Sequence, residues 1–240
     1  MGSKSAKPAA HVVAMGGGGF SMETDNPLLD DYILSLARAS RPKVCFVPTA
    51  SGDSESYCLR FYEAFARRKC VPTCLPLFKR NAQDLRSFVL EQDVIYVGGG
   101  NTANLLAVWR VHGLDRILRL ARSRGTVLCG ISAGSICWFE AGVTDSFGPR
   151  LAALRDGLGF LPGSNCPHYD GEPQRRPAYH RLVKSGLPAG LAADDGCALH
   201  FVGRRLHRVV ASRPTARAYR VEFHSGKVRE SPLEAEYLGR

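Results

Sequence analysis

The chain has 240 residues, 45% of them hydrophobic and 22% charged, which is ordinary for a soluble globular protein and enough for one large α/β domain. No apolar run approaches the length of a membrane span and no signal peptide opens the chain, so we expect a cytoplasmic protein without a membrane partner. The Lys and Arg residues behind the net charge of +10 are scattered, with no stripe of basic and aromatic residues, which argues against nucleic-acid binding.

The first two thirds of the chain alternate short apolar runs with stretches of helical spacing. Residues 1–10 are expected to form a disordered leader and residues 11–240 a single α/β domain, because no linker interrupts them. Strands are predicted at His11–Met15, Lys43–Pro48, Thr73–Phe78, Asp93–Val97 and Thr126–Ile131. Helices are predicted at Pro27–Ala39, Ser54–Lys69, Ala82–Glu91 and Thr102–Arg124, the last broken near Gly113, with a further one at Pro177–Val183.

The strand spacing changes after residue 190. Closely spaced strands are predicted at Cys197–Val202, Leu206–Ala211, Ala218–His224 and Lys227–Arg229, with hairpin turns at Gly203-Arg204 and Ser225-Gly226. We therefore expect a three-layer sandwich with a mostly parallel sheet, covered by helices and extended at one edge by antiparallel C-terminal strands.

The eight cysteines do not predict a metal site. No Cys-x-x-Cys occurs, and Cys70 and Cys74 have no Cys or His pair at zinc-site spacing elsewhere. Without an export signal, the simplest interpretation is that all of them are reduced.

Ser132 lies in Gly130-Ile131-Ser132-Ala133-Gly134, directly after an apolar strand and before small residues that begin a helix. A Gly-x-Ser-x-Gly segment between a strand and a helix is typical of a nucleophile elbow, in which the serine is exposed on a tight turn. The amide of Ala133 would then point to where an oxyanion forms. By itself this motif also fits a small-residue turn that only reverses the chain.

Two glycine runs follow other predicted strands at the same edge of the sheet. Gly98-Gly99-Gly100-Asn101 precedes a helix, so an amide of Gly99 or Gly100 is predicted to complete an oxyanion hole with that of Ala133. The run Gly16–Gly19 lacks the spacing of a phosphate loop, and we interpret it as a tight turn that allows close backbone approach.

A serine nucleophile needs a base and an acid that orients the base. Among seven histidines we favour His168, which follows Pro167 in a loop after an apolar run, over His180, which lies in a predicted helix. For the acid we favour Asp145, on a loop free to return to the site, and keep Glu140 in reserve because the helix leaving Ser132 is expected to carry it away.

Together these segments resemble the dipeptidase E and cyanophycinase group of serine peptidases, which share the class I glutamine amidotransferase-like fold. The resemblance rests on 98–102, 130–134 and 165–169 and spans roughly residues 11–225. It implies a Ser-His-Asp triad of Ser132, His168 and Asp145, an acyl-enzyme, and no metal or cofactor.

The resemblance further implies cleavage of short peptides, chiefly Asp-X dipeptides, with Asn101 and Arg175 or Arg176 contacting substrate. The alternatives are a cyanophycinase-like hydrolase of β-Asp-Arg bonds and a catalytically silent binding protein of the same fold. The expected partners are a short peptide substrate and, in a homodimer, a second copy of the chain.

Overall fold

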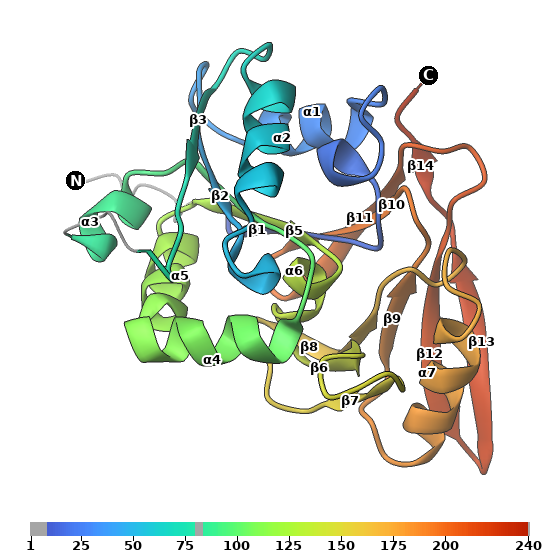
Figure 1. Ribbon diagram of the computed structural model, residues 1–240. Helices are drawn as coiled ribbons and strands as arrows, with labels where there is room; N and C mark the ends of the chain where they lie inside the picture. Colours follow the sequence, from blue (N-terminus) through green and yellow to red (C-terminus); the bar gives the residue numbers. More distant parts are fainter. Residues whose placement is uncertain (1–8, 80–83, 240) are drawn as a thin grey trace, which may run out of the picture.

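Two β-sheets form the framework of the protein in the computed structural model, which describes residues 9–79 and 84–239 (Figure 1). The first sheet has eight strands in the order β14-β11-β10-β1-β5-β4-β2-β3, and the second has six in the order β13-β12-β9-β8-β6-β7. The first-sheet strands are β1 (His11–Met15), β2 (Lys43–Val47), β3 (Val71–Cys74), β4 (Val94–Val97), β5 (Val127–Ile131), β10 (Cys197–Val202), β11 (Arg205–Ala211) and β14 (Glu236–Tyr237). The second-sheet strands are β6 (Phe139–Thr144), β7 (Ala152–Leu154), β8 (Leu161–Cys166), β9 (Gly190–Ala193), β12 (Ala218–His224) and β13 (Lys227–Leu233).

Helices cover the first sheet on both faces. Figure 1 shows α1 and α2 on one side of it and α4 and α5 on the other, while α7 lies against the second sheet. The α-helices are α1 (Leu28–Ser35), α2 (Glu55–Phe65), α3 (Leu85–Leu90), α4 (Thr102–His112), α5 (Leu114–Ser123), α6 (Ala133–Ile136) and α7 (Arg175–Lys184). Two 3₁₀ turns, η1 (Gly19–Ser21) and η2 (Thr49–Ser51), follow β1 and β2.

The parallel strands β1, β5, β4, β2 and β3 are apolar on both faces because both faces are buried. Successive residues of β1 alternate between two cores: Val12 packs in the core that contains α4 and α5, and Val13 in the core that contains α1 and α2. This layering leaves the carboxyl ends of β1, β4 and β5 side by side at one edge.

Several sequence predictions are confirmed by the structure. β1, β10 and β12 have the expected bounds, and β10 and β11 extend the first sheet in antiparallel fashion. The helical stretch predicted at Thr102–Arg124 is broken at Gly113 into α4 and α5. Ser225 and Gly226 both have positive φ, as a tight hairpin turn requires. Most of the predicted leader, and the start of the helix predicted at Ala82–Glu91, lie outside the described residues.

The second sheet is the main feature that the sequence did not predict. Its strands β6, β7, β8 and β9 fall in the segment 139–193, where no strand was assigned, and β12 and β13 join it instead of the first sheet. The helix after Ser132 is only four residues long, so Glu140 lies on β6. The segment is rich in Gly and Pro and lacks the regular alternation of a half-buried strand.

The expectation that all cysteines are reduced is wrong for one pair. Cys58 of α2 and Cys74 at the end of β3 form a disulfide that joins the helix to an edge strand of the first sheet. Six other cysteines are free and buried.

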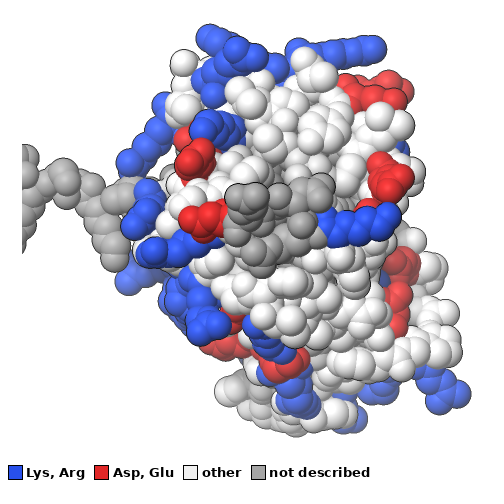
Figure 2. Space-filling view, turned by 60° about the vertical axis from the view of Figure 1, so that its left-hand side comes forward, with Lys and Arg blue, Asp and Glu red and all other residues white. Residues whose placement is uncertain are grey.

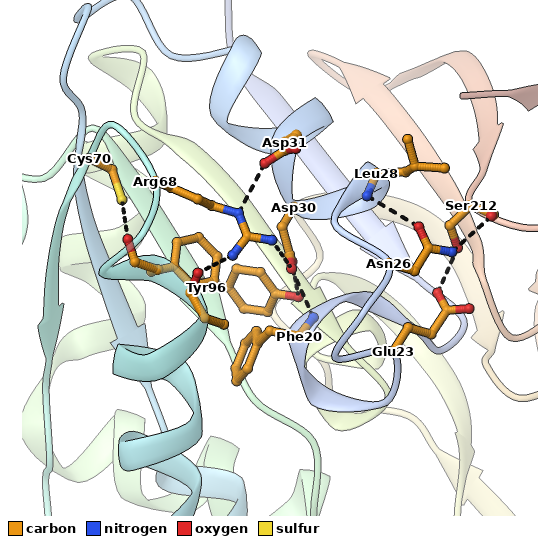
Figure 3. Close-up of polar contacts among 12 residues, drawn as sticks. Phe20, Glu23, Asn26, Leu28, Asp30, Asp31, Arg68, Cys70, Tyr96 and Ser212 are labelled. Carbon is orange, nitrogen blue, oxygen red and sulfur yellow. Dashed lines mark hydrogen bonds and ion pairs between the residues drawn. The ribbon is translucent and has the colours of Figure 1, made fainter. Parts of the chain in front are cut away.

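The segment after β1 is fixed from two sides by polar contacts (Figure 3). The buried carboxylate of Asp30 accepts hydrogen bonds from the amide of Phe20 (2.9 Å) and the hydroxyl of Tyr96 on β4 (3.2 Å), and pairs with Arg68 at 3.4 Å. On the other side, the Ser212 hydroxyl donates to Glu23 at 2.7 Å. The segment that carries Gly16–Gly19 is therefore held against β4 and against the residue after β11.

Burial raises the pKa of Asp30 to about 6, against the opposing effects of Arg68 and Tyr96. A carboxyl group whose pKa is higher in the folded than in the unfolded state contributes stability that is fully present below the unfolded-state pKa. This contribution is lost as the pH rises through the folded-state pKa, here about 6. We expect Asp30→Asn to remove this dependence, so that the unfolding free energy of the wild type relative to the variant falls by about 2 to 3 kcal/mol from pH 4 to pH 7.

Urea unfolding at several pH values measures this difference. Asp31→Asn is the matched control, because Asp31 also pairs with Arg68 but is largely exposed. Equal pH dependence of the two variants would contradict the assignment.

Candidate active site

Three consecutive residues at the end of β1 each contact a different candidate site residue. The carbonyl oxygen of Met15 accepts the amide of Ser132 at 3.4 Å, and that of Gly16 accepts the amide of His168 at 3.2 Å. Gly17 forms an isolated parallel bridge with Asp195. Residues from β5, β8 and β9 are thereby brought to one point of the first sheet, where ligands of open α/β sheets bind.

Gly17 shows why this point needs glycine. A Cβ atom on Gly17 would lie 2.0 Å from a carboxylate oxygen of Asp195, so any side chain would displace that group. The interpretation of Gly16–Gly19 as a turn for close backbone approach is confirmed.

Ser132 sits on a strained turn between β5 and α6. Its φ of 57° and ψ of −114° lie outside the regions that side chains other than glycine favour. Gly134 is close to the carbonyl oxygen of Val97, which a Cβ would approach to 2.4 Å, so the short helix packs directly on the end of β4. Strain of this kind at a serine is typical of a nucleophile elbow.

His168 also has a left-handed backbone conformation, with φ of 54°, and its side chain is largely buried. Its Nδ1 lies 2.7 Å from a carboxylate oxygen of Asp195. A proton on Nδ1 donated to this carboxylate leaves Nε2 as the free acceptor of the ring. Among the described residues, no hydrogen bond joins His168 to the hydroxyl of Ser132.

The electrostatics of Asp195 favour its charged form. Burial acts to raise the pKa, but the hydrogen bond and charge of His168, with the charges of Arg213 and Arg175, hold the pKa of Asp195 below its usual value. The amide of Asp195 donates to Asp170 at 2.8 Å, which fixes the backbone beside the carboxylate. Asp195 is thus an ionised, positioned partner for the imidazole.

The prediction that Asp145 orients His168 is wrong, because Asp195 occupies that position. Asp145 lies exposed on the loop after β6. Glu140, the reserve, accepts from the amide of Gly163 at 2.9 Å and pairs with Arg204 at 2.9 Å, on a different part of the second sheet.

Asp195 was missed because no strand was assigned to 190–193. The signal present in the sequence is the pair Asp194-Asp195 and Gly196 directly after the apolar run Leu191-Ala192-Ala193. Such a turn at the carboxyl end of a strand resembles the other three loops of the site.

The loop with the predicted oxyanion amides lies beside Ser132 at Gly99. Gly99 packs against the serine, with a Cβ on Gly99 placed 3.3 Å from the Cβ of Ser132. The Gly99 amide is already engaged, because it donates to the hydroxyl of Tyr57 at 3.3 Å. Within the described part of the chain, the amides of Gly100 and Ala133 have no hydrogen-bond acceptor, so these two are available to an oxyanion.

Asn101 and Arg175, which were predicted to contact substrate, use their side chains for hydrogen bonds within the fold. Asn101 caps α4 by accepting the amide of Asn104 at 2.8 Å and donates to the carbonyl of Ser146 at 3.1 Å. Arg175 is buried and bound to Glu172 (2.7 Å) and to the carbonyl of Val143 (3.1 Å).

Arg176 and His180 belong to a separate cluster on the second sheet. The guanidinium of Arg176 lies 4.8 Å from the ring centroids of both Tyr169 and Tyr219, and 3.5 Å from Glu230. His180 pairs with the same carboxylate at 2.7 Å. The preference for His168 over His180 as the site histidine agrees with these contacts.

Two adjoining cavities lie on the side of the site where Gly171 meets Asp195, and arginines line the outer one. A cavity of about 300 Å³ is bordered by Gly171, Glu172 and Asp145, and a Cβ on Gly171 would lie 2.1 Å from Asp195. It shares Leu151, Pro173 and Gln174 with a neighbouring cavity of about 600 Å³, which Arg150 and Arg181 line.

The described residues offer no site for two kinds of partner, a metal ion and a lipid bilayer crossed by a helix. No group of three or more His, Cys, Asp or Glu side chains there is placed to hold a metal ion. None of the helices in that part of the chain has the length and apolarity to cross a bilayer. Figure 2 shows Lys and Arg side chains spread over one face, with acidic residues between them.

Residues 12–209 match peptidase family S51. The chain is similar to the uncharacterized peptidase YgaJ of Bacillus subtilis (strain 168), with 58% identity over 229 residues, covering 95% of this chain and 99% of the relative. It is 26% identical over 189 residues to peptidase E of Pasteurella multocida (strain Pm70), covering 75% of this chain and 78% of that protein. The crystal structure of a peptidase from an acI-B1 actinobacterium shares the fold, with a TM-score of 0.71, 20% identity and 95% of both chains covered.

The rate at which a fluorophosphonate reacts with Ser132 tests the role of the His168–Asp195 pair. We expect Asp195→Asn to slow this reaction by about 10³- to 10⁴-fold, because the imidazole loses the group that fixes its tautomer. Asp145→Asn should change the rate less than about threefold, which is the scatter of such measurements, because Asp145 lies exposed on the loop after β6. Mass spectrometry of the labelled protein gives both rates. Comparable losses in the two variants would return Asp145 to the site.

Proposed function

Because the chain belongs to peptidase family S51, we propose that it is a serine exopeptidase that cleaves short peptides through Ser132, His168 and Asp195. The observation that carries this proposal is the convergence of these three residues on Met15, Gly16 and Gly17. The resemblance to dipeptidase E that the sequence motifs indicated is confirmed by the family match and by the peptidase E relative.

The proposed reaction starts with attack of the Ser132 hydroxyl oxygen on the scissile carbonyl carbon, while Nε2 of His168 takes the hydroxyl proton. Asp195 accepts the Nδ1 hydrogen bond and stabilises the imidazolium. The amides of Ala133 and Gly100 bind the oxyanion, and His168 then protonates the leaving amine. Water, deprotonated by His168, releases the acyl group and restores Ser132.

The contact between Ser132 and His168 belongs to the substrate complex in this proposal. Hydrogen bonds of catalytic groups are often long in free enzymes and shorten when substrate binds. The strained backbones of both residues support such a role, since strain of this kind concentrates at catalytic sites.

For substrates we propose dipeptides with an N-terminal aspartate. The 600 Å³ cavity that Arg150 and Arg181 line supports a preference for acidic groups, although the smaller cavity bordered by Asp145 and Glu172 lies between it and Asp195. These two arginines take the place of Arg175 and Arg176, whose guanidinium groups pair with Glu172 and Glu230. The cytoplasmic location and the homodimer stay predictions from the sequence.

Hydrolysis of Asp-X, Glu-X and β-Asp-Arg peptides by the wild type and by Ser132→Ala tests the proposed activity. We expect Asp-X to be cleaved fastest, and Ser132→Ala to lose activity by several orders of magnitude because it lacks the nucleophile. Preference for β-Asp-Arg would replace the substrate assignment by the cyanophycinase-like one. Absence of cleavage by the wild type, or equal cleavage by the variant, would falsify the peptidase mechanism.

Arg150→Gln and Arg181→Gln test the source of an acidic preference. If either guanidinium binds the substrate carboxylate, KM for Asp-X should rise about tenfold or more, as expected for loss of a charged hydrogen bond. Asn-X serves as the neutral substrate, whose KM should change little. Arg220→Gln, an exposed arginine on β12, is the control variant. Unchanged KM values in both variants would remove this cavity from the assignment.

A further inference from the structure

We propose that the hydroxyl of Tyr57 is a positioning group for the oxyanion loop, with Ser21 as its support. The inference rests on the proposed function, because it concerns how Gly98–Gly100 is held for a reaction at Ser132. Tyr57 lies in the first turn of α2, and Ser21 ends the 3₁₀ turn η1. Neither belongs to the motifs that predicted the site.

Tyr57 is in direct hydrogen-bond contact with the loop. The Gly99 amide donates to its hydroxyl at 3.3 Å, and the hydroxyl lies 2.5 Å from that of Ser21. Gly99 is also the residue packed on Ser132. A single side chain therefore links the segment after β1, the loop after β4 and the serine after β5.

The ring of Tyr57 fixes where its hydroxyl points. The residue is 6% exposed and packs on Phe46, with ring centroids 4.9 Å apart. A Cβ on Gly98 would meet the Tyr57 ring at 3.0 Å, so residue 98 is a glycine pressed against this ring. The side chain of Ser54 caps the amide of Tyr57, and the disulfide at Cys58 joins the next residue to β3.

The hydrogen bond to Tyr57 determines which amide faces the oxyanion. With the Gly99 amide turned toward Tyr57, the loop presents the Gly100 amide, which has no acceptor among the described residues. The far end of the loop is fixed separately, by the amide of Asn101 donating to Ala50 at 2.8 Å. Without the Tyr57 hydroxyl, the Gly98–Gly99 peptide loses its only side-chain acceptor in the described structure, so no side-chain hydrogen bond fixes the direction of the Gly99 amide.

The hydroxyl of Tyr57 keeps its proton at neutral pH. Burial raises the pKa of Tyr57, although the hydrogen bonds with Ser21 and Gly99 act in the opposite direction. Tyr57 accepts from Gly99 while its proton stays on the oxygen, so it does not serve as a base for Ser132.

Tyr57→Phe keeps the ring and removes only the hydroxyl. We expect kcat for the best peptide of the panel to fall about tenfold with KM nearly unchanged, less than the loss of an oxyanion donor itself, because the loop is misplaced rather than deleted. Ser21→Ala should lower kcat in the same direction by a smaller factor. Tyr62→Phe, on an exposed position of the same helix, should leave kcat and KM unchanged.

Binding without chemistry separates positioning from a general structural effect. In the Ser132→Ala background, Tyr57→Phe should leave the dissociation constant of the peptide unchanged, and a peptide boronate should bind the Tyr57→Phe protein about tenfold more weakly than the wild type. Unchanged kcat in Tyr57→Phe, or equal weakening of peptide and boronate binding, overturns the inference. If Ser132→Ala retains full activity, the proposed function fails instead.

Discussion

The close approach of β1 to three other chain segments is the constraint on which the site depends. The carbonyls of Met15 and Gly16 bind the amides of Ser132 and His168, and Gly17 adjoins Asp195. These contacts are backbone hydrogen bonds and a bridge, so they set positions more firmly than flexible side chains would. They require glycine at 16 and 17, because a Cβ there would overlap residues 193–195.

The second sheet supplies what the first sheet lacks. The turn proposed to carry the nucleophile and the loop proposed to bind the oxyanion follow β5 and β4, whereas His168 and Asp195 follow β8 and β9, which are parallel neighbours in the second sheet. Parallel pairing places the ends of β8 and β9 together, which brings His168 within 2.7 Å of Asp195 across 27 positions of sequence. Each sheet thus contributes one half of the arrangement, and β1 joins them.

The polar contacts around the segment after β1 extend this arrangement outward. Asp30 holds Phe20 against Tyr96, and the next residue, Ser21, meets Tyr57. Tyr57 in turn meets Gly99 beside the serine. A buried carboxylate without its partners would cost several kcal/mol, which explains why Arg68 and two hydrogen-bond donors converge on Asp30.

Local pattern alone determined the parallel strands, the helices between them, the elbow at Ser132 and the loop at His168, since these depend on residues adjacent in the chain. Only the tertiary structure decided which acidic residue pairs with His168, which glycine amide of the loop has no acceptor in the described part of the chain, and what Arg175 and Arg176 contact. Asp145 and Asp195 are both acidic residues on loops, and choosing between them requires the pairing of β8 with β9. Likewise, the sequence gives no reason to prefer the amide of Gly99 or that of Gly100. The hydroxyl of Tyr57, 42 residues away, distinguishes the two because it accepts the amide of Gly99. Contacts between distant residues depend on how strands pair, which the order of residues in a single segment does not encode.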